Sequence, residues 1–231
     1  MSFAWFEDAR KRYKITREQP QYWSFSKHQF GYIQIPKAAT RSIRAALMDA
    51  CGVAEEGFAD FEVRHSAHLP LEQVRKDIPG KVVFAFVRNP FARLYSAYVN
   101  KIVDAERNGA KNILRCHGMR FGMSFEEFID RVCAIDDAHI DRHLRAQSWF
   151  LADSNGLLPN FVGRLETFSQ DWDRLRGLLP VLGPVSHKNK AAGEVDHRTF
   201  YSEKGLAMVF ERYRSDFQLF GYSSSGEARS V

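Results

Sequence analysis

The chain has 231 residues, of which 45% are hydrophobic, and its 33 Lys and Arg residues against 28 Asp and Glu residues give a formal net charge of +5. This length is enough to bury a sizeable core and predicts one large domain. The small positive excess suits an anionic ligand but does not by itself indicate nucleic acid. Three widely spaced cysteines (Cys51, Cys116 and Cys133) match neither a zinc site nor a disulfide framework and favour a reducing compartment.

Residues 1–28 are polar with interspersed aromatic side chains, and we interpret them as an arm packed on the domain surface. They contain no apolar run that resembles a signal peptide, and nothing in the chain approaches the roughly 18 apolar residues of a membrane span. We therefore expect a cytoplasmic protein, although an anchor removed from an excised domain would escape this argument. The main domain is predicted over residues 29–222, with a flexible polar tail at 223–231.

The first predicted strand and helix enclose a short loop that contains a lysine. Residues 30–35 alternate apolar side chains and end at Pro36, which predicts a strand. Apolar residues at helical spacing before Gly52 predict a helix over 42–51. In the loop between them, Lys37 and the backbone N–H groups at the start of the helix could surround a phosphate or sulfate. An ordinary strand-to-helix connection is the alternative interpretation.

A second strand and helix follow. The continuous apolar run within 81–88 is typical of a strand buried on both faces, and Asn89 and Pro90 predict a helix from 90 to about 104. Further predicted elements are a short helix at 71–76, a helix opened by a capping box at Ser124, a helix over 137–151, a strand over 161–166, a helix over 170–179 and a helix capped by Ser202. This alternation predicts an α/β fold with a central parallel sheet flanked by helices.

The two strand ends place anion-binding groups together. Arg88 ends the second strand and Ser96 lies about two turns into the next helix, so both can face the crevice beyond the carboxyl ends of the strands. The loop lacks the Gly-x-x-x-x-Gly-Lys-[Ser/Thr] pattern, because Lys37 precedes the small residues instead of following them. ATP hydrolysis is therefore disfavoured.

Together the two segments resemble the sulfotransferases that use 3′-phosphoadenosine 5′-phosphosulfate (PAPS), and most closely a bacterial-like soluble member of the carbohydrate sulfotransferase branch. The segment 36–42 (Pro-Lys-Ala-Ala-Thr-Arg-Ser) is similar to the family's 5′-phosphosulfate loop, and 86–98 is similar to its 3′-phosphate motif. The resemblance covers residues 30–222 and implies a P-loop-NTPase-like fold. The donor ligands that it implies are Lys37, Ala38, Ala39, Thr40, Arg41, Ser42, Arg88 and Ser96, with Lys188 and Asn189 from a basic loop. Ala39 and Arg41 depart from the family, where many members have Gly and Thr or Ser.

Sulfuryl transfer to a hydroxyl group needs a base and a positive charge at the leaving group. We expect Lys37 at the leaving group and His65 as the base, because residues 65–69 resemble the His-x-x-x-Leu block of the carbohydrate branch. His68 is the nearby alternative, and His143 resembles a residue that lines the acceptor site. His139 and His143 stand four residues apart, but no third zinc ligand accompanies them, so we expect no metal.

The predicted function is transfer of a sulfuryl group from PAPS to a hydroxyl acceptor, in particular a carbohydrate or glycoconjugate. A kinase-like phosphotransferase is one alternative, but it needs Mg²⁺ and a carboxylate, and no acidic residue ends either strand. A non-catalytic module for anions or nucleic acid is the other, and it predicts steeply salt-dependent binding without transfer. We expect no nucleic-acid partner, and the oligomeric state is left open.

Overall fold

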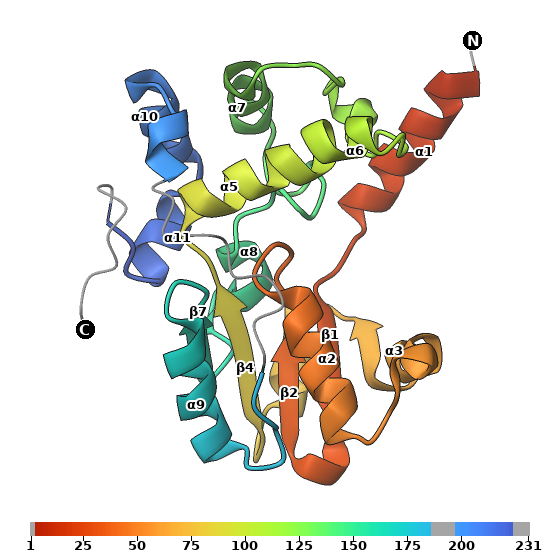
Figure 1. Ribbon diagram of the computed structural model, residues 1–231, viewed down its shortest axis with the longest axis vertical. Coiled ribbons are helices and arrows are strands. Elements are labelled where there is room, and N and C mark those ends of the chain that lie inside the picture. The colour runs from red at the N-terminus through yellow and green to blue at the C-terminus, as the bar shows by residue number, and fades with distance from the viewer. Residues whose placement is uncertain (1–2, 186–196, 224–231) are drawn as a thin grey trace. The chain divides into compact units, whose positions relative to one another are not determined.

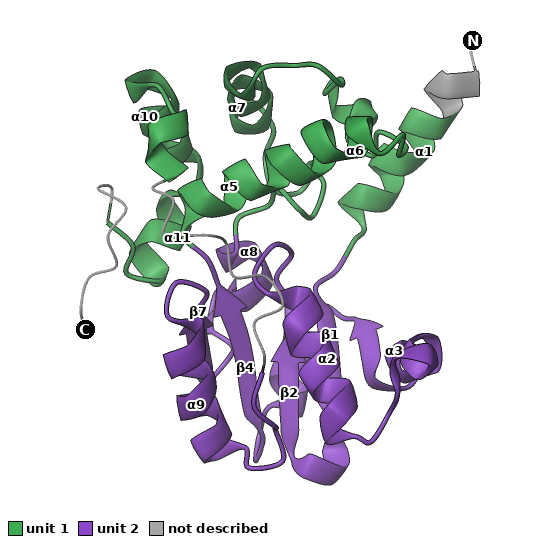
Figure 2. Cartoon of the chain, in the orientation of Figure 1, with its two compact units in different colours: residues 1–18, 89–146, 195–231 green, residues 19–88, 147–194 purple. Residues whose placement is uncertain are grey.

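The computed structural model describes residues 3–185 and 197–223, and the chain divides into two compact units (Figure 2). Unit 1 comprises residues 1–18, 89–146 and 195–231, and unit 2 comprises residues 19–88 and 147–194. Both units are discontinuous, because the chain leaves unit 2 after Arg88 and returns to it at Gln147. The sequence predicts one domain over residues 29–222, and each of the two units contains part of this range.

Unit 2 is built on a five-stranded mixed sheet with the strand order β3-β1-β2-β4-β7 (Figure 1). Its strands are β1 (Gln21–Phe25), β2 (Phe30–Ile33), β3 (Ser66–His68), β4 (Val82–Val87) and β7 (Phe161–Arg164). The strands β2, β4 and β7 are parallel, whereas β1 pairs antiparallel with both β2 and β3. The expected parallel sheet is therefore present only in part. A separate hairpin pairs β5 (Ala152–Asp153) with β6 (Gly156–Leu157).

The strand β1 corrects the prediction of a surface arm over residues 1–28. Trp23 pairs with Tyr32 of β2 on one side and with Ser66 of β3 on the other, so this segment is an interior strand. Three aromatic side chains within five residues fit such a strand, which is buried on both faces. The rest of the expected arm contains helix α1 (Phe3–Thr16), which belongs to unit 1.

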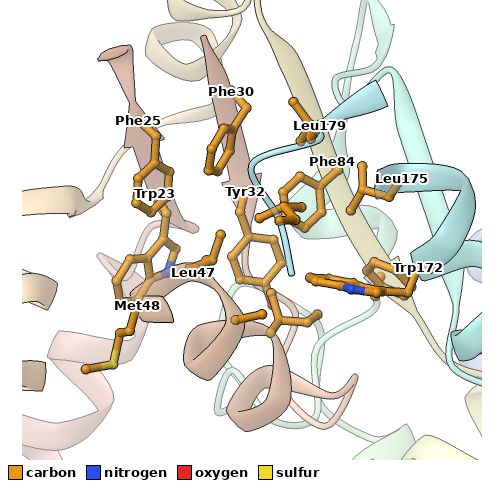
Figure 3. Packing of buried hydrophobic residues seen from close by; sticks show 14 of the residues in the cluster. Trp23, Phe25, Phe30, Tyr32, Leu47, Met48, Phe84, Trp172, Leu175 and Leu179 are labelled. Atoms are coloured by element: carbon orange, nitrogen blue, oxygen red, sulfur yellow. The ribbon is translucent and has the colours of Figure 1, made fainter. Parts of the chain in front are cut away.

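Helices cover both faces of the unit 2 sheet. They are α2 (Thr40–Ala50), α3 (Phe58–His65), α4 (Leu71–Asp77), α8 (Ser148–Leu151) and α9 (Phe168–Leu178), with short 3₁₀ turns at Ser26–His28 and Glu55–Gly57. On one face, Leu47 of α2 and Trp172 of α9 pack into a cluster with Trp23, Tyr32 and Phe84 from three strands (Figure 3). Tyr22 points to the other face, because its neighbour Trp23 points to the first, and its hydroxyl donates to Asp77 of α4 at 2.8 Å.

The elements of unit 1 over its described residues are helices and helical turns joined by irregular segments. Its elements are α1, α5 (Pro90–Tyr98), a π-helical turn (Val99–Val103), α6 (Asp104–Arg107), a 3₁₀ turn (Arg115–His117), α7 (Phe125–Cys133), a 3₁₀ turn (His197–Phe200), α10 (Glu203–Arg212) and α11 (Arg214–Leu219). The predicted capping box is confirmed, since the Ser124 hydroxyl accepts from Glu127 N at 3.2 Å and Ser124 N donates to the Glu127 carboxylate at 2.7 Å. Among the described residues, no helix has the length and apolarity needed to cross a membrane.

The predicted helix over 137–151 is wrong except for its last turn, α8. Aspartate side chains accept from backbone N–H groups that a helix would otherwise use. Asp137 accepts from Ala146 N at 2.9 Å, and Asp141 accepts from His143 N at 3.0 Å. The buried Arg145 side chain donates in turn to the Ile140 carbonyl at 3.1 Å. Aspartate competes with helical hydrogen bonding in this way, which explains why most of this segment is not helical.

Candidate functional site

The loop between β2 and α2 presents backbone N–H groups at the carboxyl end of the sheet. Lys37 and Ala39 both adopt the left-handed conformation, with φ angles of 69° and 56°. Ala39 precedes the first residue of α2, and no side chain caps this end of the helix. The N–H groups of the first helical turn, together with the helix dipole, therefore favour an anion at this position.

The polar side chains of this loop differ in their roles. The Thr40 hydroxyl donates to the Ile35 carbonyl at 3.0 Å, and Ala38 N donates to the same carbonyl at 3.4 Å. Because this bond uses the hydroxyl proton of Thr40, the side chain shapes the loop and only its backbone N–H remains for an anion. Lys37 and Ser42 are half-buried, whereas the Arg41 side chain is exposed.

The left-handed conformation of Ala39 explains why glycine suits this position. We expect Ala39→Gly to raise the free energy of unfolding by about 0.5 kcal/mol, because relief of roughly 1–2 kcal/mol of strain exceeds the entropic cost of glycine. Urea unfolding measures the change. The matched control is Ala38→Gly, which should destabilise the protein because Ala38 is fully buried and has no positive φ. Equal destabilisation by both substitutions would contradict the prediction.

Arg88 follows the last residue of β4 and is fixed by a residue that the sequence analysis missed. The Gln147 side chain accepts from Arg88 N at 2.9 Å and donates to the Arg88 carbonyl at 2.8 Å. Gln147 is completely buried. Side chains alternate along a strand, so Arg88 shares the face of Phe84 and Phe86, which is the face covered by α2. No local signal identifies Gln147, because it lies 59 residues away in the chain.

The strand register separates the two histidines considered as the base. The His65 ring stacks on Phe25, with 4.8 Å between ring centroids and 14° between ring planes. Phe25 pairs with Phe30 at the start of β2, whereas the Lys37 loop follows the end of that strand. His65 therefore packs at the opposite end of the sheet from the loop, roughly 15 Å away at about 3.3 Å per residue. This position does not suit a base that acts beside Lys37.

His68 lies at the end of the sheet where the parallel strands β2 and β4 have their carboxyl ends. It pairs with Gln21 of β1, and the Gln21 carbonyl accepts from Gln34 N just before the loop at 3.0 Å. The His68 Nδ1 atom is 2.9 Å from the carbonyl oxygen of Gln19. Since a carbonyl only accepts, Nδ1 bears the proton, and Nε2 of the neutral ring is left as a proton acceptor. The geometry thus favours His68, the alternative of the sequence analysis, over His65.

A row of hydrogen-bonded side chains connects the strands at this end of the sheet. The Gln34 amide donates to the Gln21 side chain at 2.7 Å, and the Gln21 amide donates to Glu62 of α3 at 2.9 Å and to the Ser66 hydroxyl at 3.1 Å. Gln21 and Gln34 are both buried. The row ties β2, β1 and β3 to one helix directly before the loop. Buried and hydrogen-bonded amides of this kind rigidify the backbone that they join.

The remaining predicted site residues lie elsewhere in the chain. Ser96 on α5 and His143 belong to unit 1, so their association with Lys37 and Arg88 stays a prediction. Lys188 and Asn189 lie outside the described residues. His139 and His143 bond to different aspartates, Asp136 and Asp141, each at 2.6 Å.

Within unit 1, Asp141 and His143 form a hydrogen-bonded pair. Burial raises the pKa of the Asp141 carboxyl, but the hydrogen bonds and charge of His143 outweigh burial and bring the pKa to about 2. Burial lowers the pKa of His143, against the opposing bond to Asp141. At pH 7, above this lowered pKa, the His143 ring is neutral, and it donates its Nδ1 proton to Asp141 and leaves its Nε2 atom as an acceptor.

The depressed pKa of Asp141 predicts a loss of stability in acid. The carboxylate stabilises the folded state above its ordinary pKa of 3.8, and this contribution disappears as the pH falls from about 4 to about 2. We expect Asp141→Asn to lower the free energy of unfolding by about 2 kcal/mol at pH 7 and by almost nothing at pH 2. Urea unfolding across this pH range measures the difference.

The control for this prediction is Asp136→Asn. Asp136 accepts from the backbone and ring of His139 in the same way, but both side chains are exposed. Solvent screens such exposed pairs, so the substitution should change stability little at any pH. The prediction is wrong if the stability difference for Asp141→Asn persists unchanged at pH 2.

Comparison with known proteins assigns the chain to a family. Residues 20–223 match the family model described as "Sulfotransferase family". Carbohydrate sulfotransferase 11 of Rattus norvegicus and of Mus musculus are each 25% identical to the chain, over 85% of this chain and 65% of theirs. Carbohydrate sulfotransferase 14 of Danio rerio is 24% identical, over 84% of this chain and 60% of its own length.

The chain thus spans somewhat less than two thirds of the length of these relatives. Among solved structures there is no significant match. The family model covers both strand ends described above, from β1 through the Lys37 loop, Arg88 and Gln147 to the end of α11. The chain therefore belongs to the sulfotransferase family.

Proposed function

We propose that the chain transfers a sulfuryl group from PAPS to a hydroxyl group of a carbohydrate or glycoconjugate. The observation that supports this function is the arrangement of the Lys37 loop, α2 and Arg88 at the carboxyl ends of two adjacent parallel strands of the unit 2 sheet. There the Lys37 loop and the uncapped end of α2 follow β2, and Arg88 follows the adjacent parallel strand β4. The relatives' names, which describe sulfotransferases of carbohydrates, support the acceptor class.

In this proposal the loop binds the 5′-phosphosulfate and Arg88 binds the 3′-phosphate. The left-handed Lys37 and Ala39 turn the chain so that successive N–H groups face one anion, as in the phosphate loops of other proteins. Arg88 adds a planar fork of donors that matches a phosphate. Ser96 is the further 3′-phosphate ligand that the family resemblance implies.

The proposed transfer moves one proton and breaks one bond. Nε2 of His68 accepts the proton of the acceptor hydroxyl, and the hydroxyl oxygen forms a new bond to sulfur. The bond between sulfur and the bridging oxygen of the donor breaks, and the ammonium of Lys37 neutralises the charge that develops on this oxygen. His143, with its free Nε2 atom, is proposed to line the site of the acceptor.

The experiment that tests the function supplies PAPS labelled in its sulfuryl group and a panel of oligosaccharide acceptors. We expect labelled sulfate on at least one carbohydrate and release of adenosine 3′,5′-bisphosphate in equal amount. ATP labelled in its γ-phosphate and supplied with Mg²⁺ tests the kinase-like alternative in parallel. Phosphate transfer from ATP, or failure to bind adenosine 3′,5′-bisphosphate, would reject the proposed function.

A further inference from the structure

The strand β4 is held at both of its ends by a side-chain amide that bonds twice to the backbone. At the end of the strand, Gln147 accepts from Arg88 N at 2.9 Å and donates to the Arg88 carbonyl at 2.8 Å. At the start, Asn160 accepts from Val83 N at 2.9 Å and donates to the Lys81 carbonyl at 3.0 Å. Each amide bonds to one backbone N–H and one backbone carbonyl, but only Gln147 holds a residue proposed to bind the donor.

Arg88 needs such a partner because the sheet ends just before it. The last pair between β4 and β7 joins Val87 to Arg164, and the last pair between β2 and β4 joins Tyr32 to Phe84. The Gln147 amide supplies the donor and the acceptor that a neighbouring strand would otherwise supply. It thereby extends the strand conformation by one residue and keeps the Arg88 side chain on the face of Phe84 and Phe86.

Gln147 is itself held firmly. Its side chain is completely buried, so its two bonds to Arg88 do not compete with water. Its carbonyl accepts from Phe150 N at 3.0 Å, in the first turn of α8. Loss of the amide would remove these two bonds from the Arg88 backbone, and we expect the backbone at Arg88 to shift as a result. A misplacement of about 1 Å can cost as much as about 10²-fold in rate in an enzyme. We therefore expect a shifted Arg88 to bind a phosphate more weakly.

We propose that Gln147 is a positioning residue that aims Arg88 at the 3′-phosphate and so sets the preference for nucleotides that bear this group. The inference rests on the proposed function, because it takes Arg88 as the 3′-phosphate ligand. Gln147 acts through Arg88 and does not itself bind the donor. Its effect should therefore appear in the discrimination between nucleotides with and without the 3′-phosphate, and not in nucleotide binding generally.

The test measures dissociation constants by calorimetry for adenosine 3′,5′-bisphosphate and for adenosine 5′-phosphate. The first variant is Gln147→Met, which keeps the length of the side chain and removes both hydrogen bonds. We expect it to reduce the ratio of the two affinities about tenfold, through weaker binding of the bisphosphate alone. The matched control is Asn160→Ala, which removes the equivalent bonds at the other end of β4 and should leave the ratio unchanged.

A double variant separates positioning from general destabilisation. In an Arg88→Ala background, Gln147→Met should produce no further loss of discrimination, because the residue that it positions is gone. If Gln147→Met does not fold, Gln147→Glu replaces it, since a glutamate keeps the acceptor for Arg88 N but loses the donor to the carbonyl. An unchanged affinity ratio in the Gln147 variant, or an equal loss in Asn160→Ala, overturns the inference. Absence of any preference for the bisphosphate in the wild-type protein instead counts against the proposed function.

Discussion

Replacing Lys37 with alanine is expected to lower kcat by about 10²–10³-fold while weakening the binding of adenosine 3′,5′-bisphosphate much less. Lys37 is half-buried in the turn that follows β2, and its backbone has a φ angle of 69° in the loop that we propose to bind the 5′-phosphosulfate. The charge on the bridging oxygen of the donor develops only in the transition state, so the ammonium stabilises that state more than the bound donor. Backbone N–H groups and Arg88 remain in the variant to bind the nucleotide.

The measurement compares kcat for the labelled transfer reaction with the dissociation constant of the product nucleotide. Lys27→Ala is a suitable control, because Lys27 is an exposed lysine in the turn between β1 and β2, at the other end of the sheet. Alanine is preferred to glycine at position 37, since glycine would also relieve the backbone strain of a residue with φ of 69°. An unchanged kcat in Lys37→Ala would show that the lysine does not act at the leaving group.

Replacing His68 with alanine is expected to lower kcat by about 10²–10⁴-fold, the range typical for loss of a general base. The Nδ1 proton of His68 is donated to the Gln19 carbonyl at 2.9 Å, which directs the unprotonated Nε2 atom away from the backbone. Steady-state kinetics of the labelled transfer reaction measure the change in kcat.

The control for this prediction is His65→Ala. The His65 ring packs against Phe25 and Phe61, with centroid distances of 4.8 and 4.9 Å, so its loss should reduce stability and leave kcat close to that of the wild-type protein. Thermal unfolding and steady-state kinetics of both variants separate the two effects. If His65→Ala abolishes transfer and His68→Ala does not, the assignment made from the strand register is wrong.

Much of the site could be recognised from the sequence because its signals are local. The apolar run before Pro36 predicts a strand over 30–35, and β2 occupies Phe30–Ile33 of it, while Asn89 followed by Pro90 defines the start of α5. The Asn89 side chain accepts from Phe91 N at 2.9 Å, as expected for a helix cap. Lys37 and Arg88 come shortly after the ends of β2 and β4, so local patterns were enough to select them as candidates.

Other features depended on pairings between distant segments, which local patterns do not encode. The aromatic residues of 21–25 were interpreted as part of a surface arm. This segment instead forms an interior strand, because β1 pairs with β2 on one side and with β3 on the other. The choice between His65 and His68 also depends on pairing. They lie three positions apart in sequence, but the register of β3 with β1 places only His68 at the end of the sheet where the loop lies.

The sequence by itself indicated the strand-loop-helix segments around Lys37 and Arg88, because apolar runs, prolines and helix caps act over a few residues, and the resemblance of these segments to sulfotransferase motifs indicated the family. The tertiary structure decided the mixed sheet, the separation of His65 and His68 along the strands, and the contact of the Gln147 amide with Arg88. Gln147 is the clearest case, since a single glutamine in an irregular segment has no pattern that indicates a role. Its contact with Arg88 exists only because the fold brings it to the backbone just beyond the last strand pair of β4.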